Sequence, residues 1–157
     1  MNKILTLLSA AVLLGAASCK KSADKNNGTG STKGSWQLGT KMYQAKSVNS
    51  SSSGGIYELI AISDSTTGGE AMLTIIFNGG KPASGSYPVD TGANGVYISC
   101  HTGSSVITDV YNSGAATGIN ATVTTSGNSI QVSVPSVQVL GAFSGNTTTI
   151  SASGISL

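Results

Sequence analysis

Arginine is absent from the chain of 157 residues, and histidine occurs once, as His101. All eight basic residues are therefore Lys, and only six residues are Asp or Glu. Enzymes bring several charged or nucleophilic side chains together at one site, which a chain this poor in them rarely achieves. We therefore expect a protein without catalytic residues; a hydrolase is the least favoured reading.

The few charges are also unevenly distributed along the chain. Seven of the eight Lys lie at or before Lys46, with Asp24 as the single acid there. Beyond Lys46, Lys81 stands against five acidic residues, which gives that part a net charge of −4. Binding to nucleic acid normally needs a basic face, often with Arg, so we expect no nucleic-acid partner.

Cysteine occurs only twice, as Cys19 and Cys100, and no cluster of His and Cys suggests a zinc site. The loops Asp64–Glu70 and Asp90–Gly95 contain oxygen ligands beside glycines, but neither has the several carboxylates of a calcium loop. We expect ordinary turns there, with no metal and no cofactor.

Long apolar runs are missing except for one at the start, from Ile4 to Ala17, which follows Lys3. A membrane-spanning helix needs about 20 apolar residues, so this run is too short. A basic start, a short apolar stretch and small residues before a cleavage point are typical of a secretory signal peptide. We assign residues 1–18 to it.

Ala16-Ala17-Ser18-Cys19 resembles the lipobox of bacterial lipoproteins. The resemblance implies cleavage before Cys19, acylation of its thiol and new amino terminus, and attachment to the membrane through these acyl chains. Residues 19–33 carry no apolar period and are expected to be a flexible tether. Lys20, where inner-membrane retention signals have Asp, favours the outer membrane, with the side that the protein faces left open.

Residues 34–157 are predicted to form one all-β domain of about 8–10 short strands, an antiparallel sandwich or barrel. Short apolar and β-branched segments alternate there with clusters of Gly, Ser and Asn, and no segment keeps a helical period. A turn is expected at Asn49–Gly55. The expected strands are Ser35–Thr40, Met42–Val48, Ile56–Ser63, Ala71–Phe77, Ser86–Val89, Val96–His101, Val106–Tyr111, Ile119–Thr125, Ile130–Val134, Ser136–Phe143 and Thr147–Ser153.

Alternation within the strands predicts which side chains face the core. Cys100 and His101 are neighbours and must point to opposite faces, which argues against a Cys–His nucleophile and for a buried Cys100. Between Val134 and Val137 the apolar phase shifts at Pro135, as at a bulge or bend. The hairpin of Ile56–Phe77 is apolar on both faces, so it is either covered or presents a patch.

Two acids, Glu58 and Glu70, are candidates for a glycosidase pair. A hairpin turning between them places them about 16 to 20 Å apart, whereas the reaction needs about 5 to 9.5 Å. We therefore expect surface carboxylates. Aromatic faces for stacking on sugar are available on five tyrosines that nothing in the sequence groups: Tyr43, Tyr57, Tyr87, Tyr97 and Tyr111.

Gly34-Ser35-Trp36 resembles the first-strand Gly-x-Trp of lipocalin-type barrels, although the Arg that packs on that Trp has no counterpart here. More broadly, the segments Trp36–Tyr43, Pro82–Val89 and Ser144–Asn146 resemble those of short bacterial envelope lipoproteins with a β-rich domain of unknown function. That resemblance supplies no catalytic residues.

The sequence thus predicts a lipid-anchored envelope protein that is a non-enzymatic binding or structural module for a glycan or a protein partner. The alternative is a lipocalin-like carrier of a small apolar ligand. A closed barrel with a pocket of about 300 Å³ or more would support the carrier, and a filled core the module.

Overall fold

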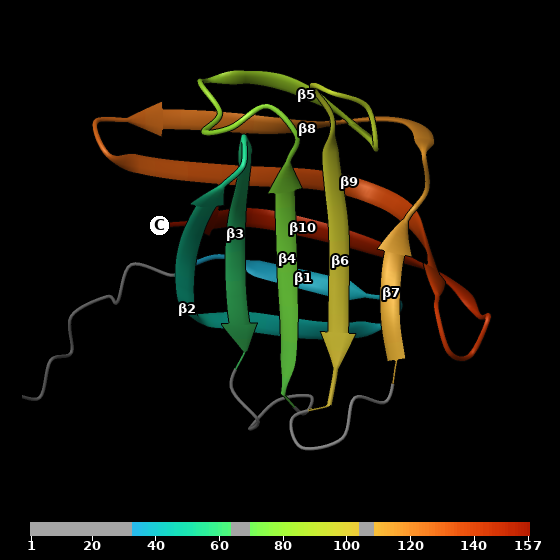
Figure 1. Cartoon of the computed structure of the whole chain (residues 1–157). Coiled ribbons are helices and arrows are strands. Elements are labelled where there is room, and N and C mark those ends of the chain that lie inside the picture. Colours follow the sequence, from blue (N-terminus) through green and yellow to red (C-terminus); the bar gives the residue numbers. More distant parts are fainter. Residues whose placement is uncertain (1–32, 64–69, 104–108) are drawn as a thin grey trace, which may run out of the picture. The chain divides into compact units, whose positions relative to one another are not determined.

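The computed structural model describes residues 33–63, 70–103 and 109–157, in which every regular element is a β-strand (Figure 1). The all-β prediction is confirmed. Residues 1–32, including Cys19, lie outside the described residues, as do positions 64–69 and 104–108. The strands are β1 (Ser35–Leu38), β2 (Lys41–Ser53), β3 (Ile56–Ser63), β4 (Ala71–Phe77), β5 (Gly85–Asp90), β6 (Val96–Thr102), β7 (Asp109–Ser113), β8 (Ala116–Ser126), β9 (Ser129–Gly141) and β10 (Thr147–Ser156).

Within this part of the chain, no helix is long and apolar enough to cross a membrane.

The hydrogen-bonded strands close into a ring. Pairing runs from β10 through β1, β2, β3 and β4 to β6, and β7 and β9 lead from β6 back to β10. A second connection from β6 to β9 runs through β5 and β8, which pair with the beginnings of β6 and β9. Of the two architectures that the sequence left open, the pairing is that of a barrel, in which β3, β4 and β6 run across β1, β9 and β10 (Figure 1).

The hairpin partners β3 and β4 have the bounds that the sequence predicted. Every second residue faces the interior, and Leu59, Leu73 and Ile75 are completely buried. Burial of each such side chain contributes about 1.5 to 3 kcal/mol. The interior is filled beside these strands by residues from all the neighbouring walls, including Ile98, Ile130 and Ile155.

Several expected strand bounds were wrong, and three of the differences bear on the pairing. Strand β2 continues through Asn49–Ser53, where a turn was expected, because β3 supplies hydrogen-bonding partners as far as Ser53. Strand β7 continues to Ser113, two residues beyond the expected end, while its expected start at Val106 lies outside the described residues. Strand β9 is continuous across Pro135, so the two strands expected there are one.

The phase shift at Pro135 is confirmed within β9. Val134 and Val137 are both buried, while Pro135 and Ser136 between them are exposed. Ala152 of β10 pairs with Val134 and Ile150 pairs with Val137, so the register shifts by one residue at this point. The result is a β-bulge that keeps the apolar side chains of both halves inside the barrel.

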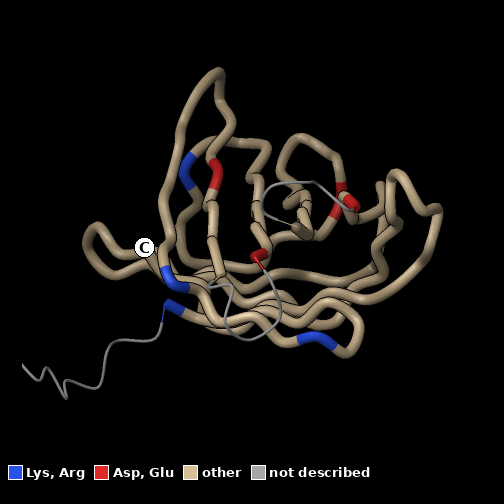
Figure 2. Tube along the Cα trace, turned by 90° about the horizontal axis from the view of Figure 1, so that it is seen from below, with Lys and Arg blue, Asp and Glu red and all other residues tan. Residues whose placement is uncertain are grey.

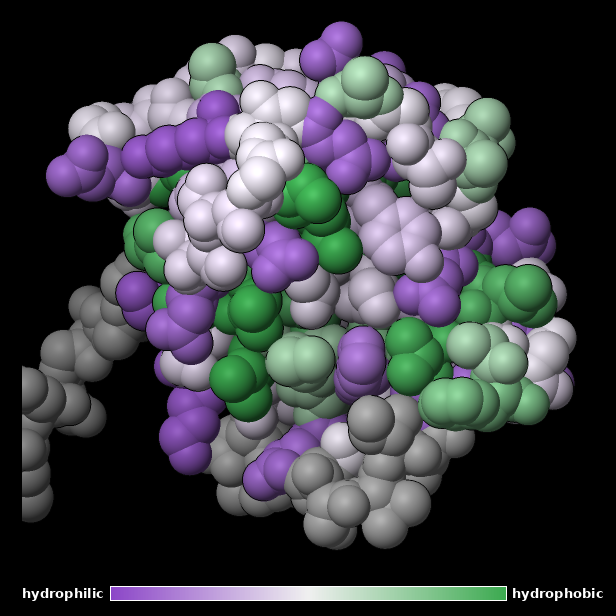
Figure 3. All heavy atoms as spheres, viewed as in Figure 1, coloured by the Kyte–Doolittle hydropathy of each residue, from purple (hydrophilic) through white to green (hydrophobic). Residues whose placement is uncertain are grey.

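The outer face of β3, β4 and β6 presents an apolar patch, which answers the question left open for the Ile56–Phe77 hairpin (Figure 3). Ile62 is 39% exposed, and its register neighbour Met72 is half-buried. His101 lies next to Met72 on β6, on this outer face.

Candidate functional site

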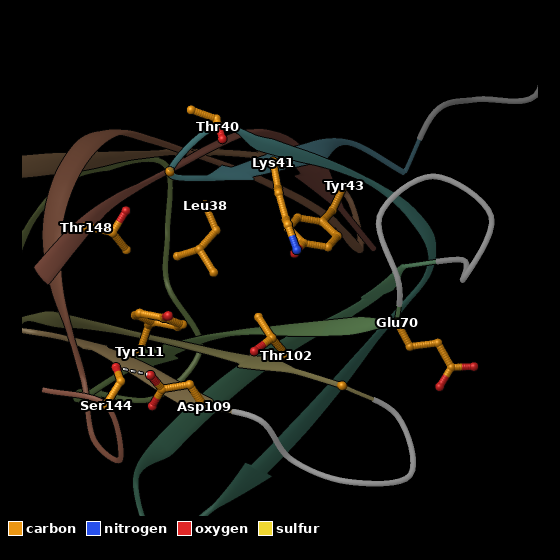
Figure 4. Close-up of a pocket in the computed structure, with 12 residues that line it drawn as sticks. Leu38, Thr40, Lys41, Tyr43, Glu70, Thr102, Asp109, Tyr111, Ser144 and Thr148 are labelled. Atoms are coloured by element: carbon orange, nitrogen blue, oxygen red, sulfur yellow. Dashed lines mark hydrogen bonds between the residues drawn. The ribbon is translucent and has the colours of Figure 1, made fainter. Parts of the chain in front are cut away.

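A cavity of about 630 Å³ lies at the end of the barrel where β1 meets β2, β6 meets β7 and β9 meets β10. Figure 4 shows side chains from these connections directed toward one another across it. The described residues that line it are Leu38, Gly39, Thr40, Lys41, Tyr43, Glu70, Thr102, Gly103, Asp109, Tyr111, Ser144 and Thr148. Hydroxyl groups and aromatic rings therefore share one hollow.

Strand alternation and one backbone hydrogen bond position the part of the cavity wall that β1 and β2 form. Leu38 and Tyr43 are inward residues of β1 and β2, and the turn between these strands contains Gly39. The Gly39 N–H donates to the Thr149 carbonyl at 2.8 Å, which holds this turn against β10. The wall is thus part of the barrel framework.

Tyr43 is held from behind by Trp36. The two rings stack with centroids 5.4 Å apart and an interplanar angle of 16°. Trp36 is 1% exposed and alternates with Leu38 on the inner side of β1. Burial raises the pKa of Tyr43 above its ordinary value, so its hydroxyl stays protonated at neutral pH. The ring is therefore a rigid, uncharged and buried part of the cavity wall.

Cys100 lies in the core on the inner face of β6, whereas His101 lies on the outer face. The predicted separation of these neighbours is confirmed. Burial raises the pKa of the Cys100 thiol to about 12, and a contact with the Trp36 indole offsets part of that rise. Within the described residues the indole N–H has no hydrogen-bond partner of ordinary geometry, since sulfur is a weak acceptor.

Asp109 is a buried carboxylate that the sequence analysis did not single out. One of its oxygens accepts from the Val110 N–H at 2.8 Å and from the Phe143 N–H at 3.1 Å, and the other accepts from the Ser144 hydroxyl. These donors, the Ser144 hydroxyl first, lower the pKa of Asp109 although burial opposes them. Asp109 therefore connects the start of β7 to the β9–β10 turn and is charged at neutral pH.

A small residue is needed beside this carboxylate. A Cβ atom at Gly141 would lie 2.5 Å from the Ser144 hydroxyl oxygen and would overlap Asp109. Little in the sequence indicates that Asp109 is buried, because an acid at the start of a β-branched segment is typical of a solvated strand end. Its burial depends on the turn of residues 142–146, which is distant in sequence.

The other candidate residues do not converge. Glu58 pairs with Ile76 of β4, whereas Glu70 precedes the start of that strand, so about 20 Å of strand separates them. The expected separation is confirmed. Asp90 accepts a hydrogen bond from the Gly92 N–H at 2.9 Å, an ordinary turn contact. The loop 64–69 lies outside the described residues.

No metal centre is formed in residues 33–63, 70–103 and 109–157, where no three His, Cys, Asp or Glu side chains gather. The Lys, Asp and Glu residues are scattered along the trace when it is seen from below (Figure 2). Of the five tyrosines, the fold brings Tyr43 and Tyr111 to one cavity. Tyr57 and Tyr87 instead contact Phe77.

Comparison with known proteins leaves the site to be interpreted from its own chemistry: no protein-family model, no curated protein and no solved structure matches the chain.

Proposed function

We propose that this protein is a lipid-anchored, non-enzymatic binding module of the bacterial envelope that takes a short glycan into the open end of its barrel. The observation that carries the proposal is the cavity of about 630 Å³ in which Tyr43 and Tyr111 meet several hydroxyl groups. Binding sites for small ligands commonly measure about 300 to 1,000 Å³.

The lining suits the two kinds of surface that a sugar has. The C–H faces of sugar rings pack on aromatic rings, and the half-buried Tyr111 supplies such a ring, whereas Tyr43 is 2% exposed and forms part of the cavity wall. Sugar hydroxyls both donate and accept hydrogen bonds, as do the hydroxyls of Thr40, Thr102 and Thr148. A site of this composition offers partners to both without a catalytic group.

The closed barrel and the cavity of about 630 Å³ meet the volume expected of a carrier, but the position of the cavity supports an apolar ligand less well. An acyl chain or other long apolar ligand needs a hollow that runs down the barrel axis. The interior is instead occupied by side chains such as Leu59, Ile75 and Ile130, all of them fully buried. The cavity is confined to one end and has polar groups around it, which favours a hydroxylated ligand.

Binding of glycans by the full chain, inserted in phospholipid nanodiscs, tests the proposal. We expect the substitution Tyr111→Ala to weaken glycan binding at least tenfold, because it removes an aromatic face from the cavity. Calorimetric titration with the ligands found on a glycan array measures the effect. The matched control is Tyr97→Ala, since Tyr97 is a half-buried tyrosine on the outer face of β6.

Two results would refute the proposed glycan site. One is equal loss of binding in both tyrosine variants. The other is saturable one-to-one binding of a hydrophobic dye, displaced by fatty acid, with no glycan bound at millimolar concentration. The second result would establish the carrier.

The anchor is tested separately, in the native host. We expect radioactive palmitate to label the wild-type protein and not a Cys19→Ala variant, and globomycin to cause accumulation of the uncleaved form. Two or more acyl chains hold a protein durably on a membrane, whereas one does so only marginally. Wild-type protein that stays unlabelled and membrane-free would rule the anchor out.

A further inference from the structure

We propose that the ligand of this cavity carries one negative charge, as a sugar acid does, and that Lys41 binds the anionic group. This inference rests on the proposed glycan-binding function and specifies its ligand class: a glycan that contains a uronic acid or another monoanionic sugar.

Three residues with formal charge line the cavity, namely Lys41, Glu70 and Asp109. The charge of Asp109 is already satisfied by two backbone N–H groups and the Ser144 hydroxyl, so it has little capacity left for a ligand. Glu70 extends away from the tyrosines and Leu38 (Figure 4). Lys41 is thus the charged residue available to a ligand.

Strand alternation directs Lys41 toward the cavity. Lys41 and Tyr43 are on the inner side of β2, whereas Met42 between them is 51% exposed on the outer side. Figure 4 shows the Lys41 side chain extending from the start of β2 beside Tyr43, with its ammonium group toward Thr102. A ligand in the cavity would therefore meet this ammonium group.

The ammonium group has no partner within the described residues: Lys41 makes neither an ion pair nor a hydrogen bond there. Ammonium donates hydrogen bonds and accepts none, so its strongest partner is an anion. A single Lys is a point charge without the fork of Arg, and the chain has no Arg. One positive charge matches a monoanion such as a carboxylate better than a doubly charged phosphate.

Matched pairs of disaccharides that differ only in one carboxylate provide the test. They are glucose, galactose and mannose disaccharides, each beside its form with one uronic acid, titrated calorimetrically into the full chain in nanodiscs. We expect the acidic member of at least one pair to bind about tenfold more tightly than the neutral one, as one charge-assisted hydrogen bond allows. The preference should shrink as sodium chloride rises from 50 to 500 mM.

Three variants test whether Lys41 is the residue that binds the anionic group. Lys41→Gln should remove the preference, so that the acidic and the neutral sugar of a pair bind this variant equally. Lys41→Arg keeps the charge and should retain the preference. Lys81→Gln, the control, removes the same charge beyond the end of β4, far from the cavity mouth, and should change nothing.

The outcomes separate this inference from the proposed function. If neutral and acidic disaccharides bind equally, or if Lys41→Gln keeps the preference, the anionic ligand class is wrong and glycan binding stands. If neither sugar of any pair binds, the proposed function itself fails, and this inference with it.

Discussion

Gly34→Ala is expected to lower the free energy of unfolding by about 3 kcal/mol, the sum of a backbone strain and a steric overlap. Gly34 has φ of +92°, a conformation that residues with a Cβ rarely adopt. The added Cβ would lie 2.5 Å from the carbonyl carbon of Gly154, which is backbone and cannot rotate away. The Gly34 carbonyl also accepts from Ala45 N–H of β2 at 2.9 Å, so movement here disturbs the closure of the barrel.

Urea unfolding of the full chain, followed by the fluorescence of Trp36, the single tryptophan, measures this change. The matched control is Gly114→Ala, because Gly114 has no positive φ and its added Cβ would meet nothing within 4 Å. We expect that control to stay within about 0.5 kcal/mol of wild type. Equal stability of the two variants would contradict the close contact between the start of β1 and β10.

Cys100 is expected to react with iodoacetamide at pH 8 about a thousandfold more slowly in the folded protein than in urea. The reactive species is the thiolate. Burial raises the pKa of this thiol from 9.0 to about 12. At pH 8 the thiolate population of the folded protein is therefore about a thousandfold smaller than that of the unfolded chain. Peptide mapping by mass spectrometry after timed quenching reports the labelling of Cys100 separately from that of any other residue.

The same pKa shift predicts how stability depends on pH. Well below pH 9 the thiol is protonated in both states, so its full contribution to stability is present there. Between pH 9 and about 12 the unfolded chain releases the proton while the folded chain keeps it, and stability falls by about 1.4 kcal/mol per pH unit. A Cys100→Ala variant should lack this part of the decline.

For the labelling experiment, a reaction of Cys100 in the folded protein as fast as in urea would show that Cys100 is accessible.

Local sequence pattern was sufficient for the strands whose residues alternate strictly. Ile56–Ser63 and Ala71–Phe77 were predicted with correct bounds because apolar residues recur at every second position between turn-forming clusters. The same alternation placed Cys100 inside and His101 outside, and it located the bulge at Pro135. These features need only neighbouring residues to be recognised.

Pattern was insufficient where a strand exists because a partner pairs with it. The serines of 50–53 have no apolar alternation and resemble a turn, yet they are strand because β3 bonds to them. Asp109 is buried at 4% exposure because a turn more than thirty residues later supplies Phe143 and Ser144 as donors. Neither partner can be identified from the residues that surround Asp109.

The amino-acid sequence by itself determined the all-β class and the inward face of most strands, because periodicity is a local property. Only the tertiary structure decided that the sheet closes, since closure joins β1 to β10 from opposite ends of the domain. It also decided that Lys41, Tyr43 and Tyr111 share one cavity. Such a cavity forms where separate connections meet in space, and their meeting depends on the register of every strand between them.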